Sequence, residues 1–191
     1  MKILYVHGFG SHYDPEHEKI KALETLGTVV GINLDYCKGY DRASGAIYDA
    51  IMEEGIDLIV GTSMGGYMAA QMGSHCGIPF VSFNPLIYPN KSLQKWIGNF
   101  VDHAGNDRCL TDTVVSEYPD ITQSGAGLIM VESGDEVLKA QDTIDLLETV
   151  FQVEWFTGGS HRFTHMEAAL PKIKAFYENA KLNYGLDNGT T

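Results

Sequence analysis

A serine flanked by glycines is the residue of this sequence whose setting points most directly to chemistry. Ser63 lies in LIVGTSMGGYMAA, residues 58–70, in the order G-x-S-x-G. Residues suited to a buried strand precede it, and small residues suited to a helix follow it. A serine on such a turn can act as a nucleophile, and the glycines let strand and helix approach closely. Because a chain with 21 glycines can contain this pattern by chance, other residues must support the interpretation.

A serine hydroxyl needs a base, and His161 is the histidine that we expect to supply it. It lies in WFTGGSHRF, after the last predicted strand and before the last predicted helix. Since loops at the carboxyl ends of parallel strands meet at one edge of the sheet, Ser63 and His161 are expected at that edge. His165, at the start of the following helix, is the alternative base.

The base needs an acid that holds its tautomer and stabilises its charged form, and Asp135 is the candidate. It lies in GLIMVESGDEVLKA, in the loop after the penultimate predicted strand. Ser133 and Glu136 also fit an S-x-x-E helix-capping box, and Glu132 and Glu136 are alternative acids. The chain order of serine, aspartate and histidine is nevertheless the one expected of an α/β hydrolase.

A glycine-containing loop after the first predicted strand could stabilise a developing oxyanion. The segment YVHGFGS lets backbone N–H groups approach a substrate oxygen, and we assign the N–H groups of Phe9 and Met64 as the two donors. A phosphate-binding loop is a weaker alternative, since the segment lacks both the G-K-[ST] of a P-loop and the third glycine of G-x-G-x-x-G.

The elements that must position these residues alternate between strand and helix. Short runs rich in Val, Ile, Leu and Phe predict strands buried on both faces, at residues 3–6, 28–34, 57–60, 79–83, 127–131 and 152–156. Helical spacing of apolar residues predicts helices at 14–26, 42–54, 64–73, 137–150 and 166–182. The expected fold is a three-layer α/β/α sandwich with a mostly parallel sheet of about six strands, in a single domain over residues 1–191.

One connection is much longer than the others. Residues 84–126 separate two predicted strands, and their first half combines aromatic and aliphatic residues with at least one short helix. Long insertions of this kind are often lids or binding loops, so we expect Tyr88, Trp96 and Ile97 to contact substrate. The alternative is an additional helix followed by a plain connector.

Composition narrows the class of partner. The formal net charge of −12 disfavours nucleic acid and anionic membranes as partners. Three scattered cysteines and the absence of a C-x-x-C pattern argue against a zinc site or a disulfide framework. We therefore expect a cytoplasmic protein that uses no metal or cofactor. Its oligomeric state cannot be read from the sequence.

The chain resembles the small bacterial α/β-hydrolase esterases of the YqiA type. The similarity lies in LYVHGFGS (4–11), VGTSMGGYMA (60–69), FNPLIYP (83–89), ESGDEVL (132–138) and GGSHRF (158–163), which occur in the family's order. It implies a minimal α/β-hydrolase fold and cofactor-free hydrolysis of small or activated acyl esters. It also places the catalytic triad at Ser63, Asp135 and His161.

Three activities remain open at this point. The first is a serine esterase that works through an acyl-enzyme. An acyl thioesterase or acyltransferase would use the same chemistry. A hydrolase-like binding module with little turnover is the alternative from another class, although the triad looks complete.

Overall fold

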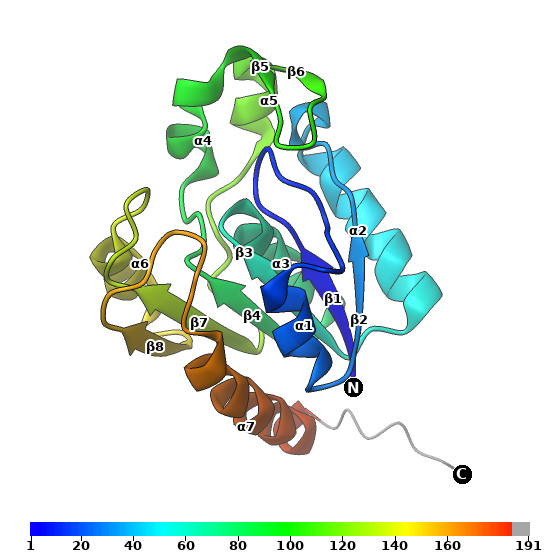
Figure 1. Cartoon of the computed structure of the whole chain (residues 1–191), viewed down its shortest axis with the longest axis vertical. Coiled ribbons are helices and arrows are strands. Elements are labelled where there is room, and N and C mark those ends of the chain that lie inside the picture. Colours follow the sequence, from blue (N-terminus) through cyan, green and yellow to red (C-terminus); the bar gives the residue numbers. More distant parts are fainter. Residues whose placement is uncertain (185–191) are drawn as a thin grey trace.

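The sheet contains six parallel strands. The computed structural model describes residues 1–184. The strands follow the order β2-β1-β3-β4-β7-β8, and each pairs in parallel with its neighbour. Their bounds are β1 Lys2–Val6, β2 Thr28–Ile32, β3 Leu58–Thr62, β4 Phe80–Phe83, β7 Gly127–Glu132 and β8 Gln152–Phe156. All six predicted strands are therefore confirmed, and their carboxyl ends lie at one edge (Figure 1).

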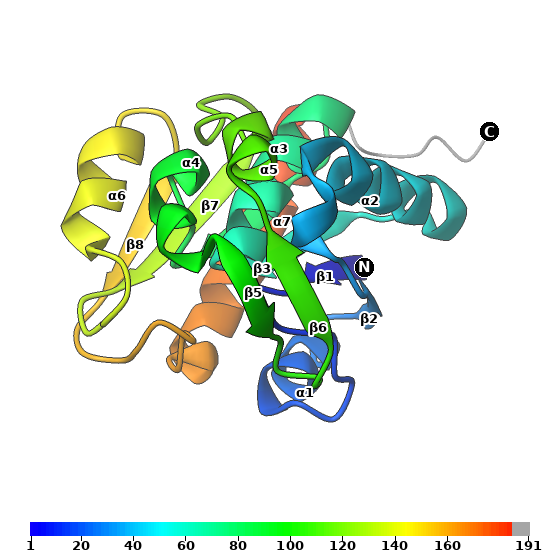
Figure 2. The ribbon, with the colours of Figure 1, turned by 90° about the horizontal axis from the view of Figure 1, so that it is seen from above.

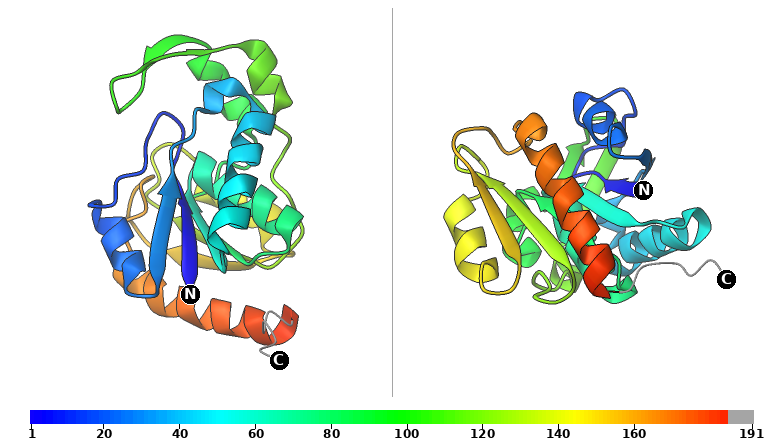
Figure 3. Two further views of the ribbon diagram at one scale, coloured as in Figure 1. Left: turned by 90° about the vertical axis from the view of Figure 1, so that its right-hand side faces the viewer. Right: turned by 90° about the horizontal axis from the view of Figure 1, so that it is seen from below.

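Helices cover both faces of this sheet and complete the predicted three layers (Figure 3). One face carries α2 (Tyr40–Glu54), α3 (Met64–Cys76) and α6 (Ala140–Leu147), and the other carries α1 (Glu18–Glu24) and α7 (Met166–Tyr184). Helix α1 is shorter than predicted, because it begins only after His17. The Nδ1 atom of His17 caps the N-terminus of α1 by accepting from the Lys19 N–H.

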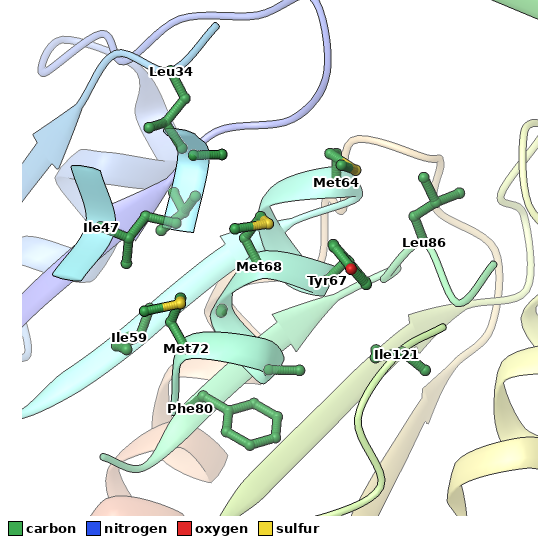
Figure 4. Packing of buried hydrophobic residues seen from close by; sticks show 14 of the residues in the cluster. Leu34, Ile47, Ile59, Met64, Tyr67, Met68, Met72, Phe80, Leu86 and Ile121 are labelled. Carbon is green, nitrogen blue, oxygen red and sulfur yellow. The ribbon is translucent and has the colours of Figure 1, made fainter. Parts of the chain in front are cut away.

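Two apolar clusters hold the layers together. Side chains that alternate along β1 enter opposite clusters, with Leu4 on the α2 and α3 side and Ile3 on the α1 and α7 side. Figure 4 shows Met68 and Met72 of α3 packed near Ile59 of β3. Both faces of the central strands β1, β3, β4 and β7 are thus buried, which explains why these strands lack polar alternation.

The long insertion contains more regular structure than the sequence suggested. The predicted short helix is α4 (Pro89–Ser92), followed by the 3₁₀ turn η2 (Gln94–Trp96). An antiparallel pair, β5 (Gly98–Val101) and β6 (Asp107–Leu110), and the helix α5 (Asp112–Glu117) were not predicted. Figures 1 and 2 show the β5–β6 hairpin above the carboxyl edge of the sheet, beside the loop that leaves β1.

The hairpin is joined to the rest of the fold by charged and aromatic contacts. Arg108 contacts Asp102 at 2.8 Å and Asp35 at 2.7 Å, and so links the hairpin to the segment before the 3₁₀ turn η1 (Tyr36–Lys38). Hydrogen bonds from the Asn106 backbone and from Arg108 hold the pKa of Asp102 well below its usual range. Below the hairpin, Phe9 packs against the rings of Trp96 and Phe100, whose centroids lie 6.0 and 5.4 Å from that of Phe9.

Candidate active site

Ser63 lies on a sharp turn between β3, which ends at Thr62, and α3, which begins at Met64. Its φ of 57° and ψ of −119° form a strained backbone conformation for a residue with a side chain. A Cβ at position 61 would overlap the backbone of Gly65, and a Cβ at 65 would overlap the carbonyl oxygen of Val6. The two glycines of the motif are therefore required by the close approach of strand and helix.

The structure brings Ser63, His161 and Asp135 into one hydrogen-bonded chain. His161 Nε2 lies 2.8 Å from Ser63 Oγ. On the other side of the ring, His161 Nδ1 lies 2.8 Å from Asp135 Oδ2 and 3.0 Å from Oδ1. The three residues come from the loops after β3, β7 and β8, at the same edge of the sheet. This arrangement can transfer the serine proton to the imidazole and stabilise the resulting positive charge.

The turn around Asp135 orients its carboxylate. Asp135 Oδ1 accepts hydrogen bonds from the Val137 and Leu138 N–H groups, both at 2.8 Å. The side chain is 2% exposed, so little competing water reaches it. The capping box considered from the sequence does not form, because α6 begins only at Ala140 and Ser133 Oγ instead accepts from the Gly158 N–H.

The fully buried Glu132 secures the loop that carries the histidine. Its carboxylate accepts hydrogen bonds from the backbone N–H groups of Ser160, Thr164 and His165, and contacts His165 Nδ1 at 2.7 Å. Burial raises the pKa of Glu132, but these hydrogen bonds outweigh burial and leave the pKa below its ordinary value. The alternative acid thus supports the loop and does not contact His161 Nδ1.

The other alternative residues also have different partners. His165 pairs with Glu132 and stacks on Phe156, with centroids 5.5 Å apart. The carboxylate of Glu136 accepts from the His161 backbone N–H at 2.9 Å. Both residues therefore support the segment around His161, and neither takes part in the chain of hydrogen bonds to Ser63.

Asn84 is a supporting residue that sequence reasoning missed. Its side-chain amide donates to the carbonyl oxygens of Ser160 and His161 at 3.0 and 3.2 Å, while its Oδ1 accepts from the Glu132 N–H at 2.8 Å. A positive φ of 42° at the end of β4 aims the side chain at this loop. An asparagine directly after a buried strand was the available signal, since asparagine tolerates this conformation.

The backbone around Phe9 and Met64 suits an oxyanion site. The Met64 N–H belongs to the first turn of α3, where amides have no partner within the helix. A Cβ at Gly8 would lie 3.6 Å from Ser63 Cβ, so the loop carrying Phe9 passes directly beside the serine. Two backbone donors near the hydroxyl could bind a developing negative charge.

His7 fixes the path of this loop. Its Nδ1 lies 2.8 Å from the Gly8 carbonyl oxygen, and its Nε2 accepts from the Leu34 N–H at 2.9 Å. The Tyr36 hydroxyl donates to the His7 carbonyl oxygen at 2.6 Å. Burial lowers the pKa of His7, which favours the neutral ring that these bonds require. The histidine before the glycines thus has a structural role that the sequence did not reveal.

A recess of about 330 Å³ opens beside Ser63 and His161. Its walls come from the segment between β1 and α1, the end of β3, His103 of the hairpin turn and Arg162. The volume is at the lower end of the range for small-molecule sites. Tyr88, Trp96 and Ile97 do not line this recess; Trp96 lies behind Phe9 and is 46% exposed. Other apolar residues of the insertion, Leu86, Ile87 and Leu93, are buried in the core.

Lys19 is buried at the base of this recess. Its Nζ donates to Thr62 Oγ1 at 3.0 Å and to the carbonyl oxygen of Arg162, and it lies 5.6 Å from the centre of the Phe83 ring. Burial lowers the pKa of Lys19 to about 7. The amine connects the residue before the serine with the residue after the histidine. The sequence gave no indication of this contact, because Lys19 lies within a predicted helix and no motif marks it.

No cluster of three or more histidine, cysteine or acidic side chains that could hold a metal ion occurs among residues 1–184. Within the same residues, every helix is too short or too polar to cross a lipid bilayer.

Solved structures with the same fold include several esterases and lipases. Est1E from Butyrivibrio proteoclasticus superposes with a TM-score of 0.72 at 14% identity, over 95% of this chain and 88% of that one. A monoacylglycerol lipase from Paleococcus ferrophilus gives a TM-score of 0.70 at 16% identity, over 94% of both chains. At these identities the likeness establishes the fold, which is that of the α/β hydrolases.

Sequence comparison gives the family. A UPF0227 protein from Serratia proteamaculans is 28% identical over 181 residues, which cover 91% of this chain and 97% of the relative. The UPF0227 protein YcfP from Escherichia coli is 26% identical with the same coverage. Residues 2–178 match the family described as "Uncharacterised protein family (UPF0227)". The chain therefore belongs to the UPF0227 family, and its fold is the α/β-hydrolase fold expected from its sequence.

Proposed function

We propose that this protein is a serine esterase that hydrolyses small or activated acyl esters through an acyl-enzyme. The observation that carries the proposal is the continuous hydrogen-bonded chain from Ser63 Oγ through the His161 ring to the Asp135 carboxylate. Esterases and lipases among the structural neighbours support the reaction class, as does the buried, ordered setting of the acid.

In the first half of the reaction, Ser63 Oγ attacks the ester carbonyl while His161 Nε2 takes the hydroxyl proton. Asp135 keeps Nδ1 protonated and stabilises the imidazolium, and the N–H groups of Phe9 and Met64 bind the oxyanion. The tetrahedral intermediate collapses, and His161 returns the proton to the leaving alcohol. The products of this half are the free alcohol and an ester between the acyl group and Ser63.

In the second half, water enters the position that the alcohol has left. His161 takes a proton from this water, the hydroxyl attacks the acyl carbonyl, and the proton returns to Ser63 Oγ as the carboxylic acid leaves. None of these steps uses a metal or an organic cofactor. Tyr88, Trp96 and Ile97 are proposed to contact longer acyl chains from the side of the insertion. Three unpaired cysteines support our placement of the enzyme in the cytoplasm.

Labelling with a fluorophosphonate probe tests the proposal. The probe reacts with serines that are activated as nucleophiles, so we expect one label per chain, at Ser63, together with hydrolysis of 4-nitrophenyl acetate. Ser63→Ala is the matched control and should abolish both signals. An intact protein that neither takes the label nor hydrolyses esters would instead be a binding module with a hydrolase fold.

A further inference from the structure

The recess beside Ser63 has a charge character opposite to that of the whole chain. The chain carries 25 acidic residues against 13 lysines and arginines. Five of its seven histidines, together with Lys19 and Arg162, line the recess, and Asp14 is the one acidic residue in the lining. A concentration of proton donors at one place in an acidic protein calls for a functional explanation.

Two of these histidines already have partners on both ring nitrogens. His7 is bonded to Gly8 and Leu34, and His161 to Ser63 and Asp135. In His17, Nδ1 accepts from the Lys19 N–H, so Nε2 is the ring nitrogen that can still bind a ligand. This bond requires an unprotonated Nδ1 and therefore leaves the ring proton on Nε2, which makes Nε2 a hydrogen-bond donor.

Further donors lie around the same opening. His12 and His103 are exposed at the mouth of the recess, and so is Arg162. Among the described residues 1–184, no carboxylate forms an ion pair with the Arg162 guanidinium. Lys19, which is buried in the lining, adds a positive charge to the recess in its protonated form.

The nearby carboxylates are occupied by other groups. Asp14 Oδ1 accepts from the Glu16 N–H at 2.9 Å. Asp102 is held by Asn106 and Arg108, and Glu132 by the histidine loop. Asp135 pairs with His161, and the charge of Glu132 favours the protonated form of Lys19. The lining itself carries Lys19 and Arg162 against the single acid Asp14, and this balance favours an anion in the recess despite the net charge of the chain.

We propose that the recess binds a carboxylate carried by the substrate, so that the preferred substrates are esters with a free carboxylate on the acyl or the alcohol part. This inference rests on the proposed esterase function and specifies its substrate class. A carboxylate suits the donors, since the Arg162 guanidinium in the lining is always positively charged and the imidazoles can donate while neutral.

Two pairs of matched esters test the preference. For the alcohol side, 4-acetoxybenzoate is compared with 4-acetoxybenzamide. For the acyl side, mono-4-nitrophenyl adipate is compared with the 4-nitrophenyl ester of adipamic acid. In at least one pair we expect kcat/KM to be about tenfold higher for the carboxylate, the size of effect typical of one charge-assisted hydrogen bond. Equal rates within both pairs, or faster hydrolysis of the amides, would overturn the proposal.

Variants locate the effect. Arg162→Gln and His103→Gln should each lower the ratio of kcat/KM for the carboxylate ester to that for the amide, by about three- to tenfold. Arg42→Gln is the matched control, because Arg42 is an exposed arginine on α2 outside the recess, and it should leave the ratio unchanged. A ratio that responds equally to all three substitutions would exclude the recess as its origin.

A binding measurement separates this inference from the esterase proposal. In Ser63→Ala, which cannot turn over substrate, the imidazole resonances of His12, His17 and His103 are followed by NMR during titration with 4-acetoxybenzoate or 4-acetoxybenzamide. Shifts caused by the carboxylate alone support the recess even if the wild type proves inactive, and the esterase proposal would then fail by itself. If the wild type is active but the imidazoles do not respond, the carboxylate site is wrong and the esterase proposal remains.

Discussion

The two sides of the candidate site are built in different ways. Below the substrate position, Ser63, Asp135 and His161 lie on turns that are fixed by buried hydrogen bonds and by glycines with no room for a side chain. Above it, the β5–β6 hairpin is attached through Arg108 and a cluster of partly exposed aromatic rings. If the proposed esterase function holds, we expect the lower side to determine the reaction and the upper side, which is less tightly packed, to influence which ester is accepted.

The largest expected effect comes from removing the nucleophile or the base. Ser63→Ala and His161→Ala should each reduce kcat by about four to six orders of magnitude, and the double variant should lose little more, because the residues act as a unit. Ester hydrolysis measured beside circular dichroism spectra checks that activity is lost while the fold is kept. A His161→Ala enzyme that retains several per cent of the activity would remove this histidine from the mechanism.

Next in size is the effect of the acid. Asp135→Asn should reduce kcat about 10⁴-fold near neutral pH, because an amide favours the wrong imidazole tautomer. Glu136→Gln is the matched control, since its carboxylate accepts from the backbone of His161 and not from the ring, and it should cost far less. If the two variants are equally impaired, the orientation of the loop matters more than the charge beside the ring.

The glycine at 65 tests how rigid the lower side is. Gly65→Ala should destabilise the protein by about 3 kcal/mol or more, because the new methyl group would overlap the carbonyl oxygen of Val6 and backbone would have to move. Gly45→Ala, on an open face of α2 with no atom near its Cβ, should instead stabilise it by about 0.5–1 kcal/mol. Urea unfolding of both variants measures the difference, and similar midpoints would contradict the account of the turn.

The smallest effect is expected on the upper side. Trp96→Ala should cost about 1 kcal/mol of stability, well below the 3–5 kcal/mol typical of a fully buried large aromatic side chain, because Trp96 is 46% exposed. We expect KM for 4-nitrophenyl octanoate to rise severalfold more than KM for the acetate. Thermal melts beside this chain-length series test both points. A large loss of stability with an unchanged chain-length preference would show that the ring only supports the fold.

The sequence predicted the lower side well for physical reasons. The four central strands, β1, β3, β4 and β7, are buried on both faces and therefore read as apolar runs, and the G-x-S-x-G turn needs glycines that are visible in the sequence. Its supporting contacts were not predictable, because Lys19, Asn84 and Glu132 act across large separations along the chain. The β5–β6 hairpin was missed as well, since its four-residue strands are half-exposed and lack a clear apolar pattern.

The support given by Glu132 has a consequence for the behaviour of the protein in acid. Its contribution to stability is present when the carboxylate is ionised and is lost as the pH falls through its lowered pKa, because the folded state then has to take up a proton that disrupts these bonds. The bonds that fail are those of residues 160–165, whereas strand β3 (Leu58–Thr62) contains no titratable side chain. Amide hydrogen exchange in this loop should therefore accelerate at a higher pH than exchange in β3, so that the loop opens as a separate cooperative unit.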